Sequence, residues 1–166
     1  AVFGKHQPAT PHLLGSAIQG DVLEHGHHFQ VNWQEGQKTG FFLDQREHRQ
    51  LLAAYASGKQ VLNTFCYSGG FSVYAIQAGA TLVHSVDSST KAIAWTDHNV
   101  TRNNPHQVPH AAIAGDVFEF LKQCEPIYDV LVLDPPAFAK SQSARHSAVM
   151  AYKRLNQLAF DKLRPN

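Results

Sequence analysis

Val61-Leu-Asn-Thr-Phe-Cys-Tyr-Ser-Gly-Gly-Phe-Ser-Val73 passes from an apolar strand pattern, through a turn that contains a glycine pair, into a helix pattern. Gly69 and Gly70 permit positive φ and a close approach of another molecule to the backbone. The helix that follows presents free amides and the positive end of its dipole, which suit a carboxylate or a phosphate. The pattern differs from GxGxxG, so it predicts either a ligand-binding loop or an ordinary strand-to-helix turn.

Strand and helix patterns alternate on both sides of this unit. We expect strands at 60–64, 81–86, 110–114 and 128–133, and helices at 45–56, 70–78, 89–103, 116–124 and 146–163. The strand at 128–133 is almost continuously apolar, as a strand buried on both faces should be. A hairpin is expected at 21–33, ahead of the alternating region. These patterns predict an α/β fold whose parallel sheet carries helices on both faces, preceded by a small N-terminal β-hairpin.

Composition limits the class of protein. The chain has 166 residues, of which 43% are apolar and 16% charged, which is typical of one folded domain rather than a disordered tail or a coiled coil. It contains no apolar run of the roughly 18 residues that span a bilayer and no signal peptide, so we expect no membrane association and a cytoplasmic location. Cys66 and Cys124 cannot form a disulfide framework, and the cluster of His25, His27 and His28 has no partner set that predicts a metal site.

Charge is distributed unevenly along the chain. From residue 140 onward there are six basic residues and one acid, a net charge of +5, whereas the preceding residues carry eight bases and twelve acids, a net charge of −4. Such asymmetry is typical of a surface that faces a polyanion, and also of a solvated amphipathic helix. Both interpretations stay open at this point.

Acidic residues follow the second and third predicted strands of the alternating region. Asp87 lies 17 residues after Gly70 and could accept hydrogen bonds from both hydroxyls of a ribose, or cap the next helix. Asp116 could accept from an adenine amino group with Val117 against the ring, although Asp116 and Glu119 also have the spacing of a helix N-terminus. Because ligands of parallel sheets bind beyond the carboxyl ends of the strands, these positions favour an enzyme.

The segment Asp129-Val-Leu-Val-Leu-Asp-Pro-Pro-Ala-Phe138 is the most specific motif. Its strand delivers an acid, Asp134, and then two prolines that stiffen the chain and remove two amide donors. The Asp134 carboxylate and the nearby carbonyls remain as acceptors, which suits a planar base that bears an amine. Phe138 is available to stack on such a base.

Three segments together resemble the bacterial large-subunit ribosomal RNA cytosine-C5 methyltransferase family, which are class I S-adenosylmethionine-dependent enzymes. They are Gly36-Gln-Lys-Thr-Gly-Phe-Phe-Leu-Asp-Gln-Arg46, Asn63-Thr-Phe-Cys-Tyr-Ser-Gly-Gly-Phe71 and Leu133-Asp-Pro-Pro-Ala-Phe138. The resemblance covers about residues 20–166 and implies a Rossmann-like class I methyltransferase sheet. It divides the chain into an irregular lead-in at 1–20, a hairpin and cofactor-covering segment at 21–43, and an S-adenosylmethionine-binding core at 44–166.

The resemblance implies specific contacts with S-adenosylmethionine. The ribose would lie on Asp87, the adenine near Asp116 and Val117, and the methyl group and target base beside Asp134 and Pro135. The methionine part would lie along Phe65, Tyr67, Ser68, Gly69 and Gly70, and the expected cofactor contacts also include Lys38, Gln45, Asn63 and Asp134.

Two features of the family pattern are not seen in this sequence. One is an N-terminal RNA-binding PUA domain; the other is a nucleophilic cysteine in a Ser-Cys-Ser-like stretch beyond the last helix. Such a thiolate must add to C6 of cytosine before C5 can accept a methyl group, and neither Cys66 nor Cys124 matches that motif. We therefore expect a truncated core that lacks its C-terminal strands, with an exposed sheet edge able to pair in a homodimer. Turnover by this fragment alone is in doubt.

Four functions stay open on the sequence. The favoured one is an S-adenosylmethionine-dependent methyltransferase acting on RNA, most specifically on cytosine C5 of ribosomal RNA. A second keeps the cofactor but methylates an exocyclic amine of a nucleic-acid base, which needs no cysteine. A third is a nicotinamide-dependent oxidoreductase, which Asp87 permits and which Asp134-Pro-Pro and the absence of GxGxxG disfavour. The fourth is a non-catalytic cofactor-binding or RNA-binding module.

Overall fold

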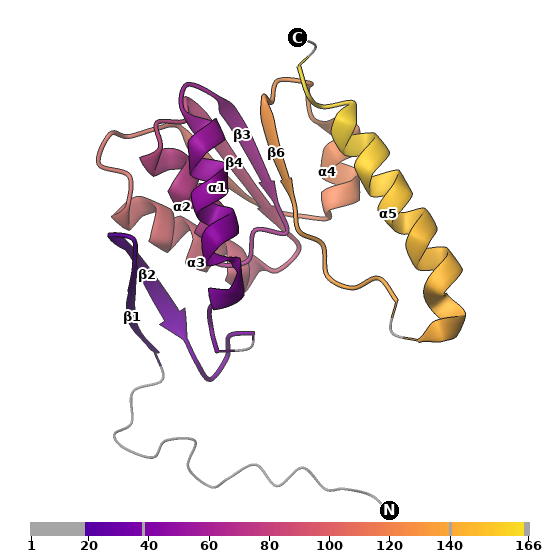
Figure 1. Cartoon of the computed structure of the whole chain (residues 1–166), viewed down its shortest axis with the longest axis horizontal. Helices are drawn as coiled ribbons and strands as arrows, with labels where there is room; N and C mark the ends of the chain where they lie inside the picture. The colour runs from indigo at the N-terminus through magenta and orange to yellow at the C-terminus, as the bar shows by residue number, and fades with distance from the viewer. Residues whose placement is uncertain (1–18, 38, 140, 165–166) are drawn as a thin grey trace, which may run out of the picture.

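The computed structural model describes residues 19–37, 39–139 and 141–164 (Figure 1). Two antiparallel strands precede a region in which strands and helices alternate. In chain order the elements are β1 (Gln19–Glu24), β2 (His27–Asn32), the 3-10 turn η1 (Leu43–Gln45), α1 (Arg46–Ala56), β3 (Gln60–Thr64), α2 (Gly70–Gln77), β4 (Leu82–Asp87), α3 (Thr90–Arg102), β5 (His110–Ala114), α4 (Val117–Gln123), β6 (Val130–Leu133), the 3-10 turn η2 (Gln142–Ala144) and α5 (Arg145–Phe160).

The main sheet is parallel and has the strand order β5-β4-β3-β6. Its register pairs Thr64 of β3 with Val86 of β4 on one side and with Leu133 of β6 on the other. The carboxyl ends of these three strands therefore share one edge of the sheet. The chain moves outward from β3 to β5 and then returns to the opposite side of β3, so strand order switches between β3 and β6, where ligands of open α/β sheets bind.

Helices cover both faces of this sheet, as predicted. On one face Val61 and Val83 lie in a buried cluster with residues of α1, α2 and α3. On the other face Leu62 and Val86 lie in a second cluster with residues of α4 and α5. Successive residues of a strand point to opposite faces, so the apolar residues of β3 and β4 contribute to both clusters. Figure 1 shows the two helical layers on either side of β3 and β6.

The β1–β2 hairpin packs on the helical layer rather than joining the main sheet. Phe29 is fully buried in the first apolar cluster. The backbone amides of Gln30 and His28 donate to the side-chain oxygens of Asn99 (2.8 Å) and Asn103 (2.9 Å) in α3. These two asparagines satisfy the edge of β2, which would otherwise present unpaired amides.

Some expected bounds need correction. The predicted strand at 128–133 is shorter, and Val130–Leu133 is half-buried rather than buried on both faces, because within the described part of the chain β6 pairs only with β3. Leu163 forms an isolated parallel bridge with Tyr128, so α5 ends earlier than predicted. The strands at 60–64 and 110–114 have the predicted bounds. In the described ranges, no helix combines the length and apolar character needed to cross a bilayer.

Candidate functional site

A cavity of about 570 Å³ lies at the carboxyl ends of β3, β4 and β6. Its walls come from the segment between β2 and α1, the loop after β3, the first turn of α3 and the turn after β6. This is the edge at which the sequence predicted a ligand site. The cavity has the size of small-molecule and cofactor sites in general.

The loop after β3 is held in a strained conformation. Phe65 (φ 55°) and Tyr67 (φ 48°) both adopt left-handed backbone, which costs of order 1–3 kcal/mol for each residue that has a side chain. Two side chains of α3 hold the loop: the Thr96 hydroxyl donates to the Tyr67 carbonyl at 2.8 Å, and the Asn99 amide donates to the Ser68 carbonyl at 3.0 Å. The loop is therefore shaped by α3 before any ligand enters.

The two predicted glycines have different roles. Gly70 lines the cavity as the first residue of α2, where free helical amides are available to an anion. Gly69 does not line it; Gly69 has φ 77°, and a Cβ there would lie 2.8 Å from Cγ2 of Thr96. Close packing on α3 therefore explains Gly69, whereas at Gly70 a Cβ would lie 3.1 Å from Cδ of Arg49 in α1.

The Asp87 carboxylate is fixed at the cavity by two backbone amides. Tyr67 N–H donates to Oδ2 at 3.0 Å and Ser89 N–H donates to Oδ1 at 2.9 Å. The helix cap of α3 is Ser89, whose hydroxyl accepts from Ala92 N–H, so the interpretation of Asp87 as the cap is wrong. Each carboxylate oxygen keeps a lone pair for another donor, such as a ligand hydroxyl.

Tyr67 ties the segment between β2 and α1 to this loop. Its hydroxyl accepts from Gln37 N–H at 2.9 Å and donates to the Gly40 carbonyl at 3.3 Å. Burial raises the pKa of Tyr67, so this phenol stays protonated and keeps both bonds. Phe42 and Gln45 of the same segment line the cavity, whereas Lys38 lies outside the described residues.

One side of the cavity rim was not predicted. Lys91 Nζ lies 2.6 Å from a carboxylate oxygen of Glu35 and 5.5 Å from the centroid of Trp95. The Trp95 ring meets Tyr67 edge-on at 5.7 Å. Lys91 and Trp95 are four residues apart in α3 and so share a helix face. The four-residue spacing of a lysine and a tryptophan shortly after Asp87 was the sequence signal that could have predicted this part of the rim.

The turn after β6 forms the opposite wall. Pro135 lines the cavity beside Asp134, and Gln45 Nε2 donates to Asp134 Oδ2 at 2.5 Å. The structure thus brings together three residues that the sequence selected from distant segments. Phe138 differs from its prediction: its ring packs against Tyr152, at 4.5 Å between centroids, rather than lining the cavity.

Three other predicted cofactor residues do not line the cavity. Asn63 is 1% exposed and donates to the Ser72 hydroxyl at 2.9 Å, beneath the loop. Asp116 caps α4 by accepting from Glu119 N–H at 3.0 Å, and Val117 is buried in the second apolar cluster. Asp116 follows β5, which neighbours the strand that ends at Asp87, so its predicted contact with adenine stays a prediction.

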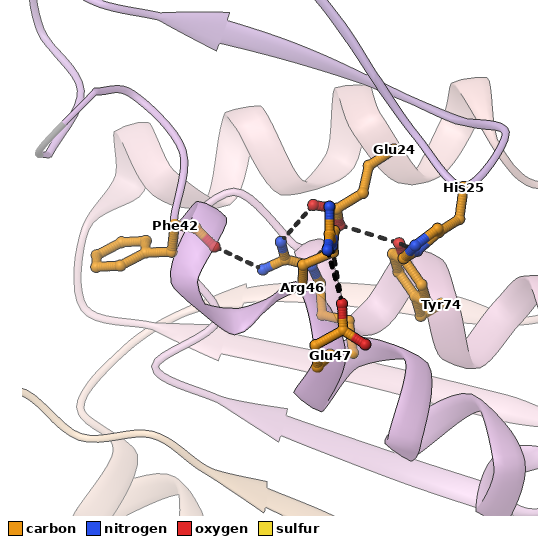
Figure 2. Close-up of polar contacts among 7 residues, drawn as sticks. Glu24, His25, Phe42, Arg46, Glu47 and Tyr74 are labelled. Atoms are coloured by element: carbon orange, nitrogen blue, oxygen red, sulfur yellow. Dashed lines mark hydrogen bonds and ion pairs between the residues drawn. The ribbon is translucent and has the colours of Figure 1, made fainter.

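A buried ion pair at the wall of the cavity was also missed. Arg49 is 2% exposed; its Nε and Nη2 each donate to Glu24 at 2.8 Å, and its Nη1 donates to the Phe42 carbonyl at 3.1 Å. The Tyr74 hydroxyl donates to Glu24 at 3.0 Å and contacts His25 Nδ1 at 2.7 Å. Figure 2 shows Glu24, His25 and Tyr74 converging from the hairpin and α2. This network fixes the hairpin against the helices that wall the cavity.

The thiol at the cavity is poorly suited to nucleophilic chemistry. Burial raises the pKa of Cys66 to about 12, and its Sγ lies 3.5 Å from the Thr96 hydroxyl. Since the thiolate is the reactive form, Cys66 is unreactive at neutral pH. This agrees with the expected role of a small buried thiol. Over residues 19–37, 39–139 and 141–164, no group of three His, Cys, Asp or Glu side chains is arranged to hold a metal ion.

Comparison with known proteins gives a consistent result. A family model described as S-adenosylmethionine-dependent methyltransferase matches residues 5–163. The chain is 40% identical over 159 residues to a ribosomal RNA large subunit methyltransferase of Deinococcus radiodurans, and 44% identical over 138 residues to ribosomal RNA large subunit methyltransferase I of Aeromonas hydrophila. These alignments cover 92% and 81% of this chain but only 39% and 35% of the relatives, so the chain spans well under half of their length.

Solved structures agree. A protein assigned as a methyltransferase and solved in complex with S-adenosylhomocysteine superposes with a TM-score of 0.75 at 30% identity, over 92% of this chain and 41% of that one. The S-adenosylmethionine-dependent methyltransferase from Agrobacterium tumefaciens superposes with a TM-score of 0.74 at 26% identity, over 93% of this chain and 51% of that one. The fold predicted from the sequence is therefore confirmed.

Proposed function

Because the chain belongs to the S-adenosylmethionine-dependent methyltransferase family, we propose that it holds this cofactor in the 570 Å³ cavity and serves methylation of large-subunit ribosomal RNA, at C5 of a cytosine. The observation that carries the proposal is the meeting, around one cavity, of the strained loop, the amide-bound Asp87 and the Asp134–Pro135 turn. Membership of this family argues against the nicotinamide-dependent alternative.

The chain's own residues would hold the cofactor at three points. The first turn of α2, which begins at Gly70, offers backbone amides to the methionine carboxylate. Asp87 accepts from the ribose hydroxyls while the amides of Tyr67 and Ser89 keep its carboxylate in place. Asp134 and Pro135, which line the cavity, would lie beside the methyl group and the target base. When bound, S-adenosylmethionine supplies an electrophilic methyl group, and the protein contributes mainly positioning.

Ribosomal RNA as substrate is supported by the names of the relatives, and cytosine C5 by the motif resemblance. The target base must be unpaired or flipped out to reach Asp134. Cys66 is protonated at neutral pH, so it is not assigned as the nucleophile that C5 chemistry needs. We place the protein in the cytoplasm with its RNA. A homodimer through the edge of β6 stays a prediction.

A second candidate is methylation of an exocyclic amine on a nucleic-acid base. The turn after β6 favours it, because Pro135 and Pro136 have no N–H and the Asp134 carboxylate is exposed, which leaves acceptors only. Such a site suits an amino group and needs no thiolate. Mass spectrometry of nucleosides from methylated RNA distinguishes 5-methylcytidine from an N-methylated base.

Calorimetric titration with S-adenosylhomocysteine tests the cofactor site. We expect saturable heat with the wild type and a ten- to hundredfold weaker affinity for Asp87→Ala, since hydrogen bonds to a charged group contribute roughly 1.5–3 kcal/mol. Asp161→Ala is the matched control, because Asp161 is an exposed acid at the far end of α5. Absence of heat from a folded wild-type sample, or equal losses in the two variants, would contradict the proposal.

A further inference from the structure

Most described lysine and arginine side chains are engaged within the protein. Lys162 Nζ donates to the Cys124 carbonyl at 2.7 Å. Ion pairs with carboxylates engage Arg46, Arg49, Lys91, Arg102, Lys122 and Arg164. Within the described ranges, four such side chains have no hydrogen bond or ion pair. Three of these four lie on α5: they are Arg145, Lys153 and Arg154, and the fourth is Lys59.

Helix α5 also carries no acidic residue from Arg145 to Phe160. It buries only a narrow stripe, of which Leu155 is fully buried, and leaves Val149 56% and Met150 50% exposed. Arg145 stands in the first turn, where the helix dipole disfavours a cation, and neither an acid nor a side-chain cap offsets it there. No contact among the described residues therefore stabilises these positive charges. An external anion bound beside them would do so.

The position of α5 relates these charges to the cavity. The Tyr152 hydroxyl donates to the Pro136 carbonyl and accepts from Phe138 N–H, both at 3.4 Å. Pro136 lines the cavity, so α5 is attached to the turn that forms one of its walls. Figure 1 shows α5 beginning at the end of the molecule where β6 ends and running back beside it. A polymer with one base in the cavity would pass along this helix.

We propose that the exposed face of α5, defined by Arg145, Val149, Met150, Lys153 and Arg154, docks the phosphate backbone of single-stranded RNA beside the target base. The choice of RNA as the ligand rests on the proposed function. The choice of this surface rests on the complementarity between its positive side chains and the negative phosphates. Arg145 and Lys153 are eight residues apart, so about 12 Å of helix separates them, and both can contact one extended strand.

An anionic membrane surface is the other polyanion that a basic helix can meet, and the arrangement on α5 argues against it. Helices that lie in a membrane separate a charged face from an apolar face. On α5, Val149 lies between Arg145 and Lys153 at successive i, i+4 positions, so the cations and the apolar side chains share one face. That mixture suits a nucleic acid, which presents phosphates and bases together.

Fluorescence anisotropy with a labelled 20-nucleotide single-stranded RNA, repeated over a range of salt, tests the proposal. We expect the triple variant Arg145→Gln, Lys153→Gln and Arg154→Gln to bind at least tenfold more weakly. The slope of log affinity against log salt should fall by about 2, because each phosphate contact on a single strand contributes roughly 0.7. The matched control replaces Lys59, Lys122 and Arg164 by Gln, which removes the same charge near the amino ends of the strands and should change affinity less than threefold.

The outcomes separate this proposal from the cofactor proposal. An unchanged salt slope in the α5 variant, equal losses in both triple variants, or no RNA binding by the wild type would overturn the docking surface, whatever the calorimetry shows. Binding to vesicles of phosphatidylcholine with 30% phosphatidylserine, without binding to RNA, would overturn it in favour of a membrane. The affinity for S-adenosylhomocysteine should be the same in both triple variants as in the wild type. If the wild type does not bind S-adenosylhomocysteine, that result counts against the proposed cofactor site and not against the docking surface.

Discussion

Gln45 Nε2 donates to Asp134 Oδ2 at 2.5 Å, although 89 residues separate the two along the chain. The bond joins the start of α1 to the end of β6 across the cavity. It orients one oxygen of the Asp134 carboxylate and leaves the other available to a ligand. The segment between β2 and α1 is therefore joined to the Asp-Pro-Pro turn in the folded chain.

Removing either Gln45 or Asp134 breaks the hydrogen bond between them, so each change should weaken cofactor binding for the same reason. We expect Gln45→Met and Asp134→Asn each to reduce the affinity for S-adenosylhomocysteine about fivefold, since one hydrogen bond to a charged group is worth on the order of 1 kcal/mol at an exposed position. The double variant should lose clearly less than the sum of the two. Calorimetry on all four proteins measures the coupling, and strict additivity would show that the bond does not act on the site.

Asp116 can be tested as a ligand group separately from its role as a helix cap. Asp116→Ser keeps an N-cap side chain, so we expect the free energy of unfolding to change by less than about 0.5 kcal/mol. If the carboxylate contacts adenine, affinity for S-adenosylhomocysteine should fall about tenfold. Urea unfolding and calorimetry together give both values. An unchanged affinity would limit Asp116 to capping.

Gly69 and Gly58 form a natural pair for separating backbone strain from steric clash. Both have positive φ, 77° and 72°, but only at Gly69 would a Cβ meet Thr96, at 2.8 Å. We expect Gly58→Ala to cost about 1 kcal/mol and Gly69→Ala at least about 1 kcal/mol more. Adding Thr96→Ser to Gly69→Ala should recover part of the difference, because it removes Cγ2 and keeps the hydroxyl. Chemical denaturation gives the free energy of unfolding of the wild type and the three variants. Equal losses for Gly58→Ala and Gly69→Ala would contradict the clash with Thr96.

The two neighbouring arginines of α1 should differ strongly in their effect on stability. Arg49→Met leaves Glu24 as a buried charge without its partner, so we expect a loss of about 3–5 kcal/mol in the free energy of unfolding. Arg46→Met breaks only the exposed pair with Glu47 and should cost less than about 1 kcal/mol. The exposed pair of Arg46 and Glu47 is labelled in Figure 2, as is Glu24. Urea melts of the two variants make the comparison, and similar midpoints would show that the buried network does not stabilise the fold.

Stability should fall in mild acid because of histidines held neutral in the fold. Burial lowers the pKa of His84 and of His110, whose Nε2 lies 2.9 Å from the Ser85 hydroxyl. Below about pH 6.5 the unfolded chain protonates these rings and the folded chain resists, so the unfolded state binds more protons. The free energy of unfolding should be flat above pH 7 and decrease as the pH falls below 6.5. His110→Gln, which can still accept from Ser85, should reduce that slope; an identical slope would contradict the assignment to His110.

The sequence predicted the alternation of elements, and it placed the loop after β3, Asp87 and Asp134 at one edge of the sheet, because each signal is local: strand patterns, a glycine pair and an acid at a strand end are read within a few residues. It did not predict Arg49, Lys91 or Trp95 at the cavity. These residues stand inside helices with no motif around them, and only the packing of α1 and α3 brings them to the site.

The burial of individual side chains and of the edge strand was harder to predict from the sequence. The apolar run at 130–133 suggested a strand buried on both faces, but β6 is only half-buried at the edge of the described sheet, and no local pattern tells how completely the neighbouring elements cover such an edge. Asn63 was selected with its motif, although its side chain is absent from the lining of the cavity and donates to Ser72. Membership of a motif does not tell which of two faces a strand residue occupies.

The Asn99 side chain has a consequence for how this molecule can be divided. Its oxygen accepts from Gln30 of the hairpin while its nitrogen donates to Ser68 of the ligand loop. Removing the N-terminal hairpin would expose the Asn99 side chain and take away the bond that orients it toward Ser68. Through Asn99 the hairpin therefore contributes to the position of the loop that lines the cavity.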